Sequence, residues 1–409
     1  MYRLAVIASH PIQYQAPWFQ ALAKDVDLDV FYCQRQTAEL QRDAGFAEAF
    51  EWDVPLLEGY RFHWLTNVSK HPGVERFAGC DTRDIASVLC DGRFDACIVN
   101  GWYLKSYLQA IRACWRWEIP VLMRGDSHLR TPRRRMVQWA KYLPYRGLLS
   151  RIDAHLCVGR ANQQYLCHYG VSRSRLFFAP HFVDNQRFAA GAARAVADGS
   201  AAALRAHAGA SPETTVFAFV GKLVEHKRPG DFVNALAHLH RRGANVRGLV
   251  VGSGSLAEPL KRHAVEMGAP VTFAGFKNQR ALPACYAASD CVVLPSTSET
   301  WGLVVNEAMA CGRPAIVSHT VGCRDDLIDD SYTGISFRMG DIDALTTAMD
   351  GMMRSLRTHH EARAAAIAER IACYDCRAAV AGTLQAVEFV TETRADTTHA
   401  LTLPTPVDR

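Results

Sequence analysis

Residues 291–314 read CVVLPSTSETWGLVVNEAMACGRP and contain a strand, a loop and a helix in immediate succession. The apolar run Cys291–Leu294 is typical of a buried strand, and the polar loop that follows ends it. A helix is expected to begin near Gly302 and to end before Gly312, and Pro314 is expected to start the next strand. A short buried strand followed at once by a helix indicates a parallel sheet with helical crossovers.

The same alternation of short apolar runs and helical patterns extends over the whole chain. In the first half, the predicted strands are residues 4–8, 30–33, 97–99, 121–123, 155–158 and 176–179. In the second half, they are residues 216–220, 248–251, 271–273, 291–294, 315–317 and 335–337. Two such series predict an α/β protein with two Rossmann-like, doubly wound domains.

The length of 409 residues also favours two domains, because single domains seldom exceed about 250 residues. The expected parts are an N-terminal domain over 1–185, an alanine-rich linker with one short helix over 186–214, and a C-terminal domain over 215–372. A C-terminal helix over 373–390 is expected, and its return to the N-terminal domain is one option. Residues 391–409 are rich in Thr and Pro, and we expect a disordered tail there.

The composition excludes several classes of protein. Hydrophobic residues make up 49% of the chain and charged residues 21%, which is typical of a globular protein. No apolar run approaches the length of about 20 residues that spans a bilayer, and the N-terminus lacks the plan of a signal peptide. The 13 cysteines show no disulfide-framework spacing. We therefore expect a cytoplasmic protein that works in solution or at the inner face of the membrane.

The opening segment places two carboxylates beside a helix N-terminus. Glu299 lies in the loop at the carboxyl end of the strand, where open α/β sheets bind their ligands. Glu307 lies about 7–8 Å further along the helix. The amides of Gly302, Leu303 and Val304 face outward between them and suit an anion. Two sets of hydroxyls separated by a diphosphate would fit this order, as in a nucleotide-sugar.

In these features the chain resembles the retaining glycosyltransferases of family 4, also called group 1 glycosyltransferases. Their hallmark is two Glu separated by seven residues, matched here by Glu299 and Glu307. The resemblance implies the GT-B fold, in which two Rossmann-like domains face each other across a cleft. Further segments match family motifs in the same order: residues 179–184, 219–227, 251–256 and 273–276. Residues 9–14, Ser-His-Pro-Ile-Gln-Tyr, resemble a polysaccharide-associated branch of the family.

The resemblance implies a donor site for a nucleoside-diphosphate sugar on the C-terminal domain. Glu307 is expected to bind the ribose, and Glu299 the hydroxyls of the sugar. Lys222 and Lys227 are expected to counter the charge of the departing diphosphate, although the family generally has Arg at the position of Lys222. The other donor-binding candidates are Gly221, Gly252, Gly254, Phe276, Gly302, Leu303 and Val304.

On the N-terminal domain, the family carries a His at a strand end near the transferred sugar. The corresponding stretch here offers Arg124, Asp126 and His128, and the sequence leaves open which one takes that position. Asp126 and His128 are the catalytic candidates. The candidates for the acceptor side lie in strand-end loops: His10, Gln13, Tyr14, Trp102 and Arg124. A structural role is the alternative for His10, as a helix cap, and for Trp102, as a core residue.

The formal net charge is +5, yet residues 124–151 contain seven Arg and one Lys against only Asp126, a local charge of +7. A basic amphipathic helix is expected from Pro132 to Pro144. Its apolar positions are Met136, Trp139, Ala140 and Leu143, and its basic ones are Arg133, Arg134, Arg135 and Lys141. Either this helix is attracted to an anionic membrane surface, or it buries its apolar face in its own domain. Nucleic-acid binding is not expected, because no recognised module accompanies the cluster.

Together these features predict a retaining hexosyl-type transfer from a nucleoside-diphosphate sugar to an acceptor hydroxyl. The acceptor is expected to be a saccharide or a lipid-linked saccharide in bacterial polysaccharide or glycoconjugate synthesis. No metal and no cofactor are expected, because no Asp-x-Asp motif follows an apolar strand. Two alternatives remain at this point: a nucleotide-sugar epimerase of GT-B fold, and a non-catalytic nucleotide-sugar-binding subunit.

Overall fold

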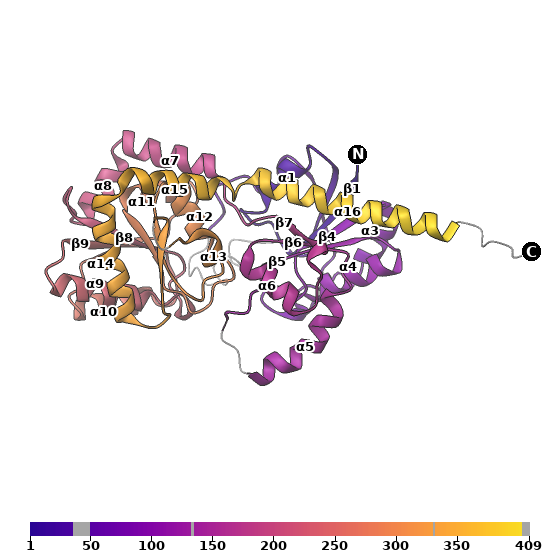
Figure 1. Ribbon diagram of the computed structural model, residues 1–409, viewed down its shortest axis with the longest axis horizontal. Helices are drawn as coiled ribbons and strands as arrows, with labels where there is room; N and C mark the ends of the chain where they lie inside the picture. Colours follow the sequence, from indigo (N-terminus) through magenta and orange to yellow (C-terminus); the bar gives the residue numbers. More distant parts are fainter. Residues whose placement is uncertain (36–49, 132–134, 330–331, 403–409) are drawn as a thin grey trace, which may run out of the picture.

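The computed structural model describes residues 1–35, 50–131, 135–329 and 332–402, and it has two α/β domains (Figure 1). Each domain is a parallel sheet with helices on both faces. The long C-terminal helix follows the C-terminal domain in sequence but packs on the N-terminal domain. This confirms the expected fold class of two Rossmann-like domains.

The N-terminal sheet has seven parallel strands in the order β3-β2-β1-β4-β5-β6-β7. Its strands are β1 (Arg3–Ala8), β2 (Asp27–Tyr32), β3 (Arg61–Trp64), β4 (Ala96–Val99), β5 (Val121–Gly125), β6 (Ala154–Cys157) and β7 (Leu176–Phe178). Six of them were predicted. The edge strand β3 was missed, because it alternates exposed Arg61 and His63 with half-buried Phe62 and Trp64 and lacks an apolar run.

The C-terminal sheet has six parallel strands in the order β10-β9-β8-β11-β12-β13. They are β8 (Thr215–Val220), β9 (Val246–Val251), β10 (Val271–Gly275), β11 (Cys291–Leu294), β12 (Ala315–Ser318) and β13 (Gly334–Phe337), and all six were predicted. The order in which strands are added reverses at β8 and β11: β9 and β10 follow on one side of β8, and β11, β12 and β13 on its other side. The crevice outside their carboxyl ends is therefore the expected ligand site of this domain.

Helices cover both faces of each sheet (Figure 1). On the N-terminal domain they are α1 (Ala16–Leu22), α3 (Ile85–Gly92), α4 (Lys105–Arg116), α5 (Arg135–Leu149) and α6 (Arg160–His168). On the C-terminal domain they are α9 (Pro229–Arg241), α10 (Ala257–Glu266), α11 (Leu282–Ala288), α12 (Leu303–Ala310), α13 (Arg324–Leu327), α14 (Ile342–Thr358) and α15 (His360–Ala372). None of the helices in the described ranges is both long and apolar enough to cross a membrane.

The expected linker over 186–214 is wrong, since this segment forms part of the C-terminal domain. It contains two helices, α7 (Asn185–Ala197) and α8 (Ser200–His207), where one short helix was expected. Phe188, Ala192 and Ala195 recur at helical spacing and are buried in the C-terminal core. Because alanine side chains allow close approach, this alanine-rich stretch packs directly on α11 and does not act as a spacer.

The C-terminal helix, α16 (Cys376–Thr402), returns to the N-terminal domain. Its buried residues Ala379, Ala386, Val387 and Val390 belong to the core between α1 and the N-terminal sheet. At Gly382 a Cβ atom would lie 1.8 Å from the carbonyl oxygen of Phe178, so the helix backbone lies directly against β7.

The expected disordered tail over 391–409 is wrong for its first part, because α16 continues to Thr402. The hydroxyl of Thr391 donates a hydrogen bond to the carbonyl of Val387, 2.9 Å away, and Thr393 bonds to Phe389 in the same way. Threonine hydroxyls that are bonded to the preceding turn are compatible with a helix. Residues 403–409 lie outside the described residues.

Candidate functional site

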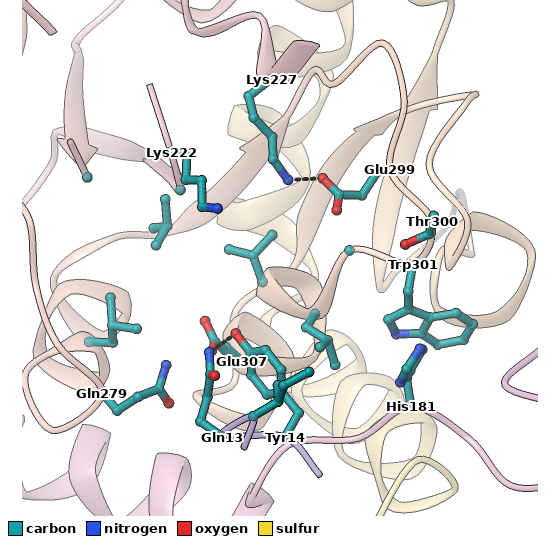
Figure 2. A pocket seen from close by; sticks show the side chains of 18 of the residues that line it. Gln13, Tyr14, His181, Lys222, Lys227, Gln279, Glu299, Thr300, Trp301 and Glu307 are labelled. Atoms are coloured by element: carbon teal, nitrogen blue, oxygen red, sulfur yellow. Dashed lines mark hydrogen bonds and ion pairs between the residues drawn. The ribbon is translucent and has the colours of Figure 1, made fainter. Parts of the chain in front are cut away.

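A pocket of about 880 Å³ lies between the two domains, at the carboxyl ends of their central strands. The C-terminal domain contributes the turns after β8 and β9, the loop between β11 and α12, and the first turns of α12. The N-terminal domain contributes the loop after β1 and the end of β5. The ligand site was expected where the order of the strands reverses in the C-terminal sheet. The N-terminal domain forms the opposite wall of that site (Figure 2).

Glu299 lines this pocket from the loop between β11 and α12. Its carboxylate forms an ion pair with Lys227, whose side chain comes from the turn after β8 (Figure 2). The two side chains are 17% and 19% exposed, so the pair is only partly screened by solvent. The amide of Gly322 donates to the carbonyl of Glu299 at 3.0 Å, and the imidazole Nε2 of His128 donates to the same oxygen at 2.8 Å. The backbone of Glu299 is thus held from both domains.

Glu307 lies deeper, at the second turn of α12, and is only 3% exposed. Its carboxylate accepts hydrogen bonds from the hydroxyl of Tyr286 and, at 3.5 Å, from the hydroxyl of Tyr14 in the opposite domain. Burial raises the pKa of Glu307 to about 7, against the lowering effect of the hydrogen bonds from Tyr286 and Gln279. Burial and the charge of Glu307 raise the pKa of Tyr14 well above its usual range. Tyr14 therefore remains a hydrogen-bond donor.

The N-terminus of α12 opens into the pocket between the two carboxylates. Gly302, Leu303 and Val304 all line the pocket, as predicted. Gly302 precedes the helix with φ = +104°, a left-handed conformation in which glycine is favoured. The side chain of Lys222 points into the same space, and burial lowers the pKa of its ammonium group. A cation and a helix N-terminus that face one cavity can hold a phosphate group.

Gly221, Gly252 and Phe276, which were expected to bind the donor, also line the pocket. The ring centroid of Phe276 lies 4.5 Å from that of Phe50, which belongs to the N-terminal domain. Gly254 was also expected here, but it does not line the described pocket. A Cβ atom on Gly254 would lie 2.5 Å from the backbone carbonyl oxygen of Leu223. This glycine therefore allows the turn after β9 to pack closely against the turn after β8.

The N-terminal wall carries a pair of titratable side chains, Asp126 and His181. The imidazole Nε2 lies 3.6 Å from a carboxylate oxygen of Asp126, and the His181 ring centroid lies 5.8 Å from that of Trp301. Burial raises the pKa of Asp126, but the adjacent His181 and Thr300 side chains outweigh it and bring the pKa to about 2. Burial lowers the pKa of His181, although Asp126 opposes this shift. Near neutral pH the pair is thus a carboxylate beside a neutral imidazole.

The other N-terminal candidates fall into two groups. Gln13, Tyr14 and Arg124 line the pocket. Arg124 is buried, donates to the carbonyl of Pro180 at 3.1 Å, and has its pKa lowered to about 10 by burial. The expectation that the strand ends deliver polar groups to one cavity holds for these three residues.

His10, Trp102 and His128 are placed elsewhere, so the expectation that they line the cleft is wrong. The Nδ1 of His10 lies 2.9 Å from the hydroxyl of Ser9, and burial lowers the pKa of this imidazole to about 4. Trp102 is a core residue, because its ring lies against Gly125 and stacks on Tyr165. His128 bridges the domains, as it donates to Glu299 and accepts from the amide of Arg130 at 3.1 Å.

Several pocket residues had not been singled out from the sequence. They are Trp52, Glu75, His181, His226, Ser253, Lys277, Gln279, Thr300 and Trp301. Thr300 and Trp301 lie inside the segment 291–314, and His181 lies inside the matched segment 179–184, so their neighbours could have indicated them. Trp52, Glu75 and Gln279 belong to loops without a recognisable motif, and only chain topology brings them to the pocket.

Further polar contacts join the two domains outside the pocket. Arg130 forms an ion pair with Asp325 and donates to the carbonyl of Val321 at 3.3 Å. The backbone amide of Arg160 donates to both carboxylate oxygens of Asp326, at 3.0 and 3.1 Å. These contacts hold the two walls of the pocket together. Within the described ranges, no group of three or more His, Cys, Asp and Glu side chains is arranged to hold a metal ion.

Residues 201–369 match the family model of glycosyl transferases group 1. The chain is 37% identical over 179 residues to a D-inositol 3-phosphate glycosyltransferase of Nocardia farcinica, an alignment that covers 42% of this chain and 38% of that protein. It is 34% identical over 123 residues to a GDP-mannose-dependent alpha-(1-6)-phosphatidylinositol dimannoside mannosyltransferase of Mycobacterium tuberculosis, covering 30% and 32% of the two chains. The match thus spans about a third of the length of these curated relatives.

A likeness over the full length comes from solved structures. An Anabaena protein crystallised with UDP-glucose superposes with a TM-score of 0.66 and 15% sequence identity, covering 97% of this chain and all of that one. At this level of identity the likeness concerns the fold alone. Both domains, with the cleft between them, therefore have the architecture of known proteins.

Proposed function

Because residues 201–369 match the family model of glycosyl transferases group 1, we propose that this protein is a retaining glycosyltransferase. It moves a sugar from a nucleoside-diphosphate sugar to a hydroxyl of a saccharide or lipid-linked saccharide. The process it serves is bacterial polysaccharide or glycoconjugate synthesis at the cytoplasmic face of the membrane. The observation that carries the proposal is that Glu299 and Glu307 line one pocket together with Lys222, Lys227 and the start of α12.

The donor lies along the C-terminal wall of the pocket. Glu307, deep in the pocket, accepts hydrogen bonds from the ribose hydroxyls, and the aromatic ring of Phe276 lies beside the base. Lys222 and the α12 amides hold the diphosphate. Glu299 accepts hydrogen bonds from the sugar hydroxyls, while Lys227 holds its carboxylate in place.

The transfer occurs on one face of the sugar. The acceptor oxygen forms its bond to the anomeric carbon on the side from which the diphosphate oxygen departs, so the configuration is retained. The acceptor proton passes to a phosphate oxygen of the leaving group, and no metal is required. Lys222, Lys227 and the α12 N-terminus stabilise the charge that develops on that group.

The acceptor approaches from the N-terminal wall. Gln13 and Tyr14 shape its entrance, and Arg124 and Asp126 lie at the end of β5. His181 was not predicted, yet its imidazole and the carboxylate of Asp126 face the reacting end of the pocket. In this arrangement the pair orients hydroxyl groups near the anomeric carbon, with Asp126 as the acceptor of their hydrogen bonds.

The test is a nucleotide-sugar panel that begins with UDP-glucose and GDP-mannose. We expect nucleotide release that depends on an added saccharide acceptor, and an NMR coupling constant that shows the same anomeric configuration in product and donor. Interconversion of the donor without an acceptor would identify an epimerase. Saturable binding without turnover would identify a non-catalytic subunit, and an inverted product would contradict the retaining mechanism.

Lys227→Met provides a sharper test of the donor site. Removal of one group that stabilises developing charge lowers kcat by about 100- to 1000-fold. Lys261→Met is the matched control, because Lys261 pairs with Glu258 on the surface, where the side chains are 50% and 70% exposed. Equal turnover of the Lys227→Met variant and the wild type would contradict the assigned role.

A further inference from the structure

The first half of α5 leaves the body of the N-terminal domain (Figure 1). Met136, Trp139 and Leu143 are 85%, 86% and 74% exposed. Their spacing places the three side chains on one face of the helix, which we term the α5 apolar face. Soluble proteins rarely expose such large apolar side chains together without a function.

The second half of α5 is anchored. Leu149 is fully buried, and Tyr142, Tyr145 and Leu148 pack on the core of the N-terminal domain. These contacts keep the chain helical beyond Pro144, where the sequence had predicted its end. One end of the helix is thus fixed to the domain, and the other presents the α5 apolar face outward. The alternative that this face is buried in its own domain is wrong.

The segment that contains this face carries charge of a single sign. Residues 127–152 contain seven Arg and Lys and no Asp or Glu. On the helix itself, Arg146 is exposed and follows Leu143 by three residues and Trp139 by seven, so it extends the α5 apolar face with a cation. Lys141 lies on the far side of the helix, 5.7 Å from the centre of the Tyr145 ring. The basic residues Arg133 and Arg134, which precede the helix, lie outside the described residues. A partner for this surface must therefore be both apolar and anionic.

We propose that the α5 apolar face docks on an anionic lipid bilayer. Trp139 and its apolar neighbours enter the boundary between headgroups and acyl chains, and the surrounding cations bind the anionic headgroups. The helix lies in the plane of the membrane and does not span it, in line with its length and its charges. A second copy of the chain is the less suitable occupant, because it would bring an equally positive segment against this one.

The residues that precede α5 contact the loop that carries Glu299. In the segment that leads into it, His128 donates to the carbonyl of Glu299, and the hydroxyl of Thr131 lies 3.3 Å from that of Ser298. The loop that carries Glu299 is thus within contact of the segment that enters α5. The inference goes beyond the proposed transfer reaction, because membrane docking requires neither donor nor acceptor.

The experiment measures co-sedimentation of the full chain with vesicles of phosphatidylcholine mixed with phosphatidylglycerol, and with vesicles of phosphatidylcholine alone. The wild type is expected to bind the anionic vesicles at least about tenfold more tightly than the neutral ones, and high salt is expected to weaken this binding. A triple variant with Met136→Gln, Trp139→Gln and Leu143→Gln is expected to lose about tenfold or more in affinity. Val265→Gln is the control, because Val265 is 81% exposed on the other domain.

Two further measurements separate docking from misfolding and from self-association. Stabilisation of the triple variant by nucleotide-sugar, equal to that of the wild type, shows that the pocket is intact. Trp139→Phe is expected to keep vesicle binding and to lose part of the fluorescence quenching by lipids with brominated chains. Absence of binding to anionic vesicles, or unchanged binding of the triple variant, overturns the proposal. A dimer in solution that the triple variant dissolves overturns it in favour of a second copy.

Discussion

Glu299 and Glu307 are separated by seven residues in one segment, yet their surroundings give them different electrostatic properties. The carboxylate of Glu299 is paired with the Lys227 ammonium. The carboxylate of Glu307 is buried among hydroxyl groups from Tyr14 and Tyr286, and its pKa rises to about 7. Two carboxylates with divergent environments can serve two purposes in one pocket. Here we assign Glu299 to the sugar and Glu307 to the ribose.

The raised pKa of Glu307 predicts a pH-dependent affinity for the donor. An ionised carboxylate accepts hydrogen bonds from both ribose hydroxyls, whereas the protonated form must donate one of its own. With a pKa of about 7, the affinity of the wild type for a nucleotide-sugar is expected to rise about tenfold between about pH 6 and about pH 8. Glu307→Gln is expected to bind the donor more weakly and with a flat pH profile in calorimetric titration.

The raised pKa of Glu307 also predicts that the free energy of unfolding falls as the pH rises, which is opposite to the trend of donor affinity. The folded pKa lies above the usual value of 4.5, so the stability contributed by protonated Glu307 is present below that value and is lost as the pH rises through about 7. The melting temperature of Glu307→Gln, relative to the wild type, should therefore be higher at alkaline pH than at acidic pH. A pH-independent difference between the two proteins would show that Glu307 does not titrate in this range.

At the scale of the element, the proposed diphosphate site depends on the start of α12. Gly302 adopts φ = +104°, and a Cβ atom there would lie 3.1 Å from both Leu294 and Val321. The end of β11 and the first turn of α12 are thus packed so closely that a side chain at position 302 would require its neighbours to move. This explains why the sheet delivers the helix N-terminus to the pocket at this position.

Gly302→Ala is expected to destabilise the fold by about 1–3 kcal/mol, because it combines a left-handed conformation with close contacts. The matched variant is Gly312→Ala at the other end of α12. Gly312 has φ = +74°, but a Cβ atom there would meet nothing within 4 Å. Its cost is therefore expected to be about 1 kcal/mol. Urea unfolding measures both changes.

Donor binding distinguishes the two glycines further. Gly302→Ala is expected to weaken nucleotide-sugar binding, since it displaces the α12 amides, whereas Gly312→Ala leaves them in place. If both variants bound the donor like the wild type, the helix N-terminus would have no part in holding the diphosphate. Equal loss of stability in the two variants would show that the packing around Gly302 is unimportant.

At the scale of the whole molecule, the pocket exists because the domains are held against each other. Tyr14 reaches Glu307 across 293 positions of sequence, and Arg130 pairs with Asp325. Helix α16 then fixes the end of the chain to the N-terminal domain, so the C-terminal domain is connected to it at two points. In the proposed reaction, this closure excludes water from the donor and favours transfer over hydrolysis.

Arg130→Met and Asp325→Asn are each expected to raise the ratio of donor hydrolysis to transfer. The Arg130 and Asp325 side chains are 19% and 27% exposed, so loss of the pair shifts the closure equilibrium by about two- to fivefold. The double variant is expected to resemble either single one, because both remove the same contact. Arg354→Met is the control, since Arg354 pairs with Asp350 on one exposed helix surface.

Nucleotide release in the absence and presence of acceptor measures that ratio. An unchanged ratio in all three variants would show that this ion pair does not hold the domains closed. Additive effects of the two substitutions would indicate that Arg130 and Asp325 act through different contacts.

Local sequence was sufficient for the parts of this protein whose signals are contiguous. Buried parallel strands are nearly continuous apolar runs, so twelve strands were recognised, whereas the half-exposed edge strand β3 was not. The C-terminal wall of the pocket, proposed to bind the donor, was recognisable because Glu299, Gly302 and Glu307 share one strand–loop–helix unit. The position of each residue relative to the helix N-terminus follows from the geometry of that unit.

Residues that belong together only through chain topology could not be recognised in this way. The pairing of Asp126 with His181 depends on the order of β5, β6 and β7 in the sheet. Trp102 and His10 both follow strands, but the direction of each side chain, toward the core or the cleft, depends on what packs against it. The exposure of Met136, Trp139 and Leu143 depends on the absence of a covering element among the described residues. Sequence periodicity determines which residues share a face, whereas packing in three dimensions determines what that face meets.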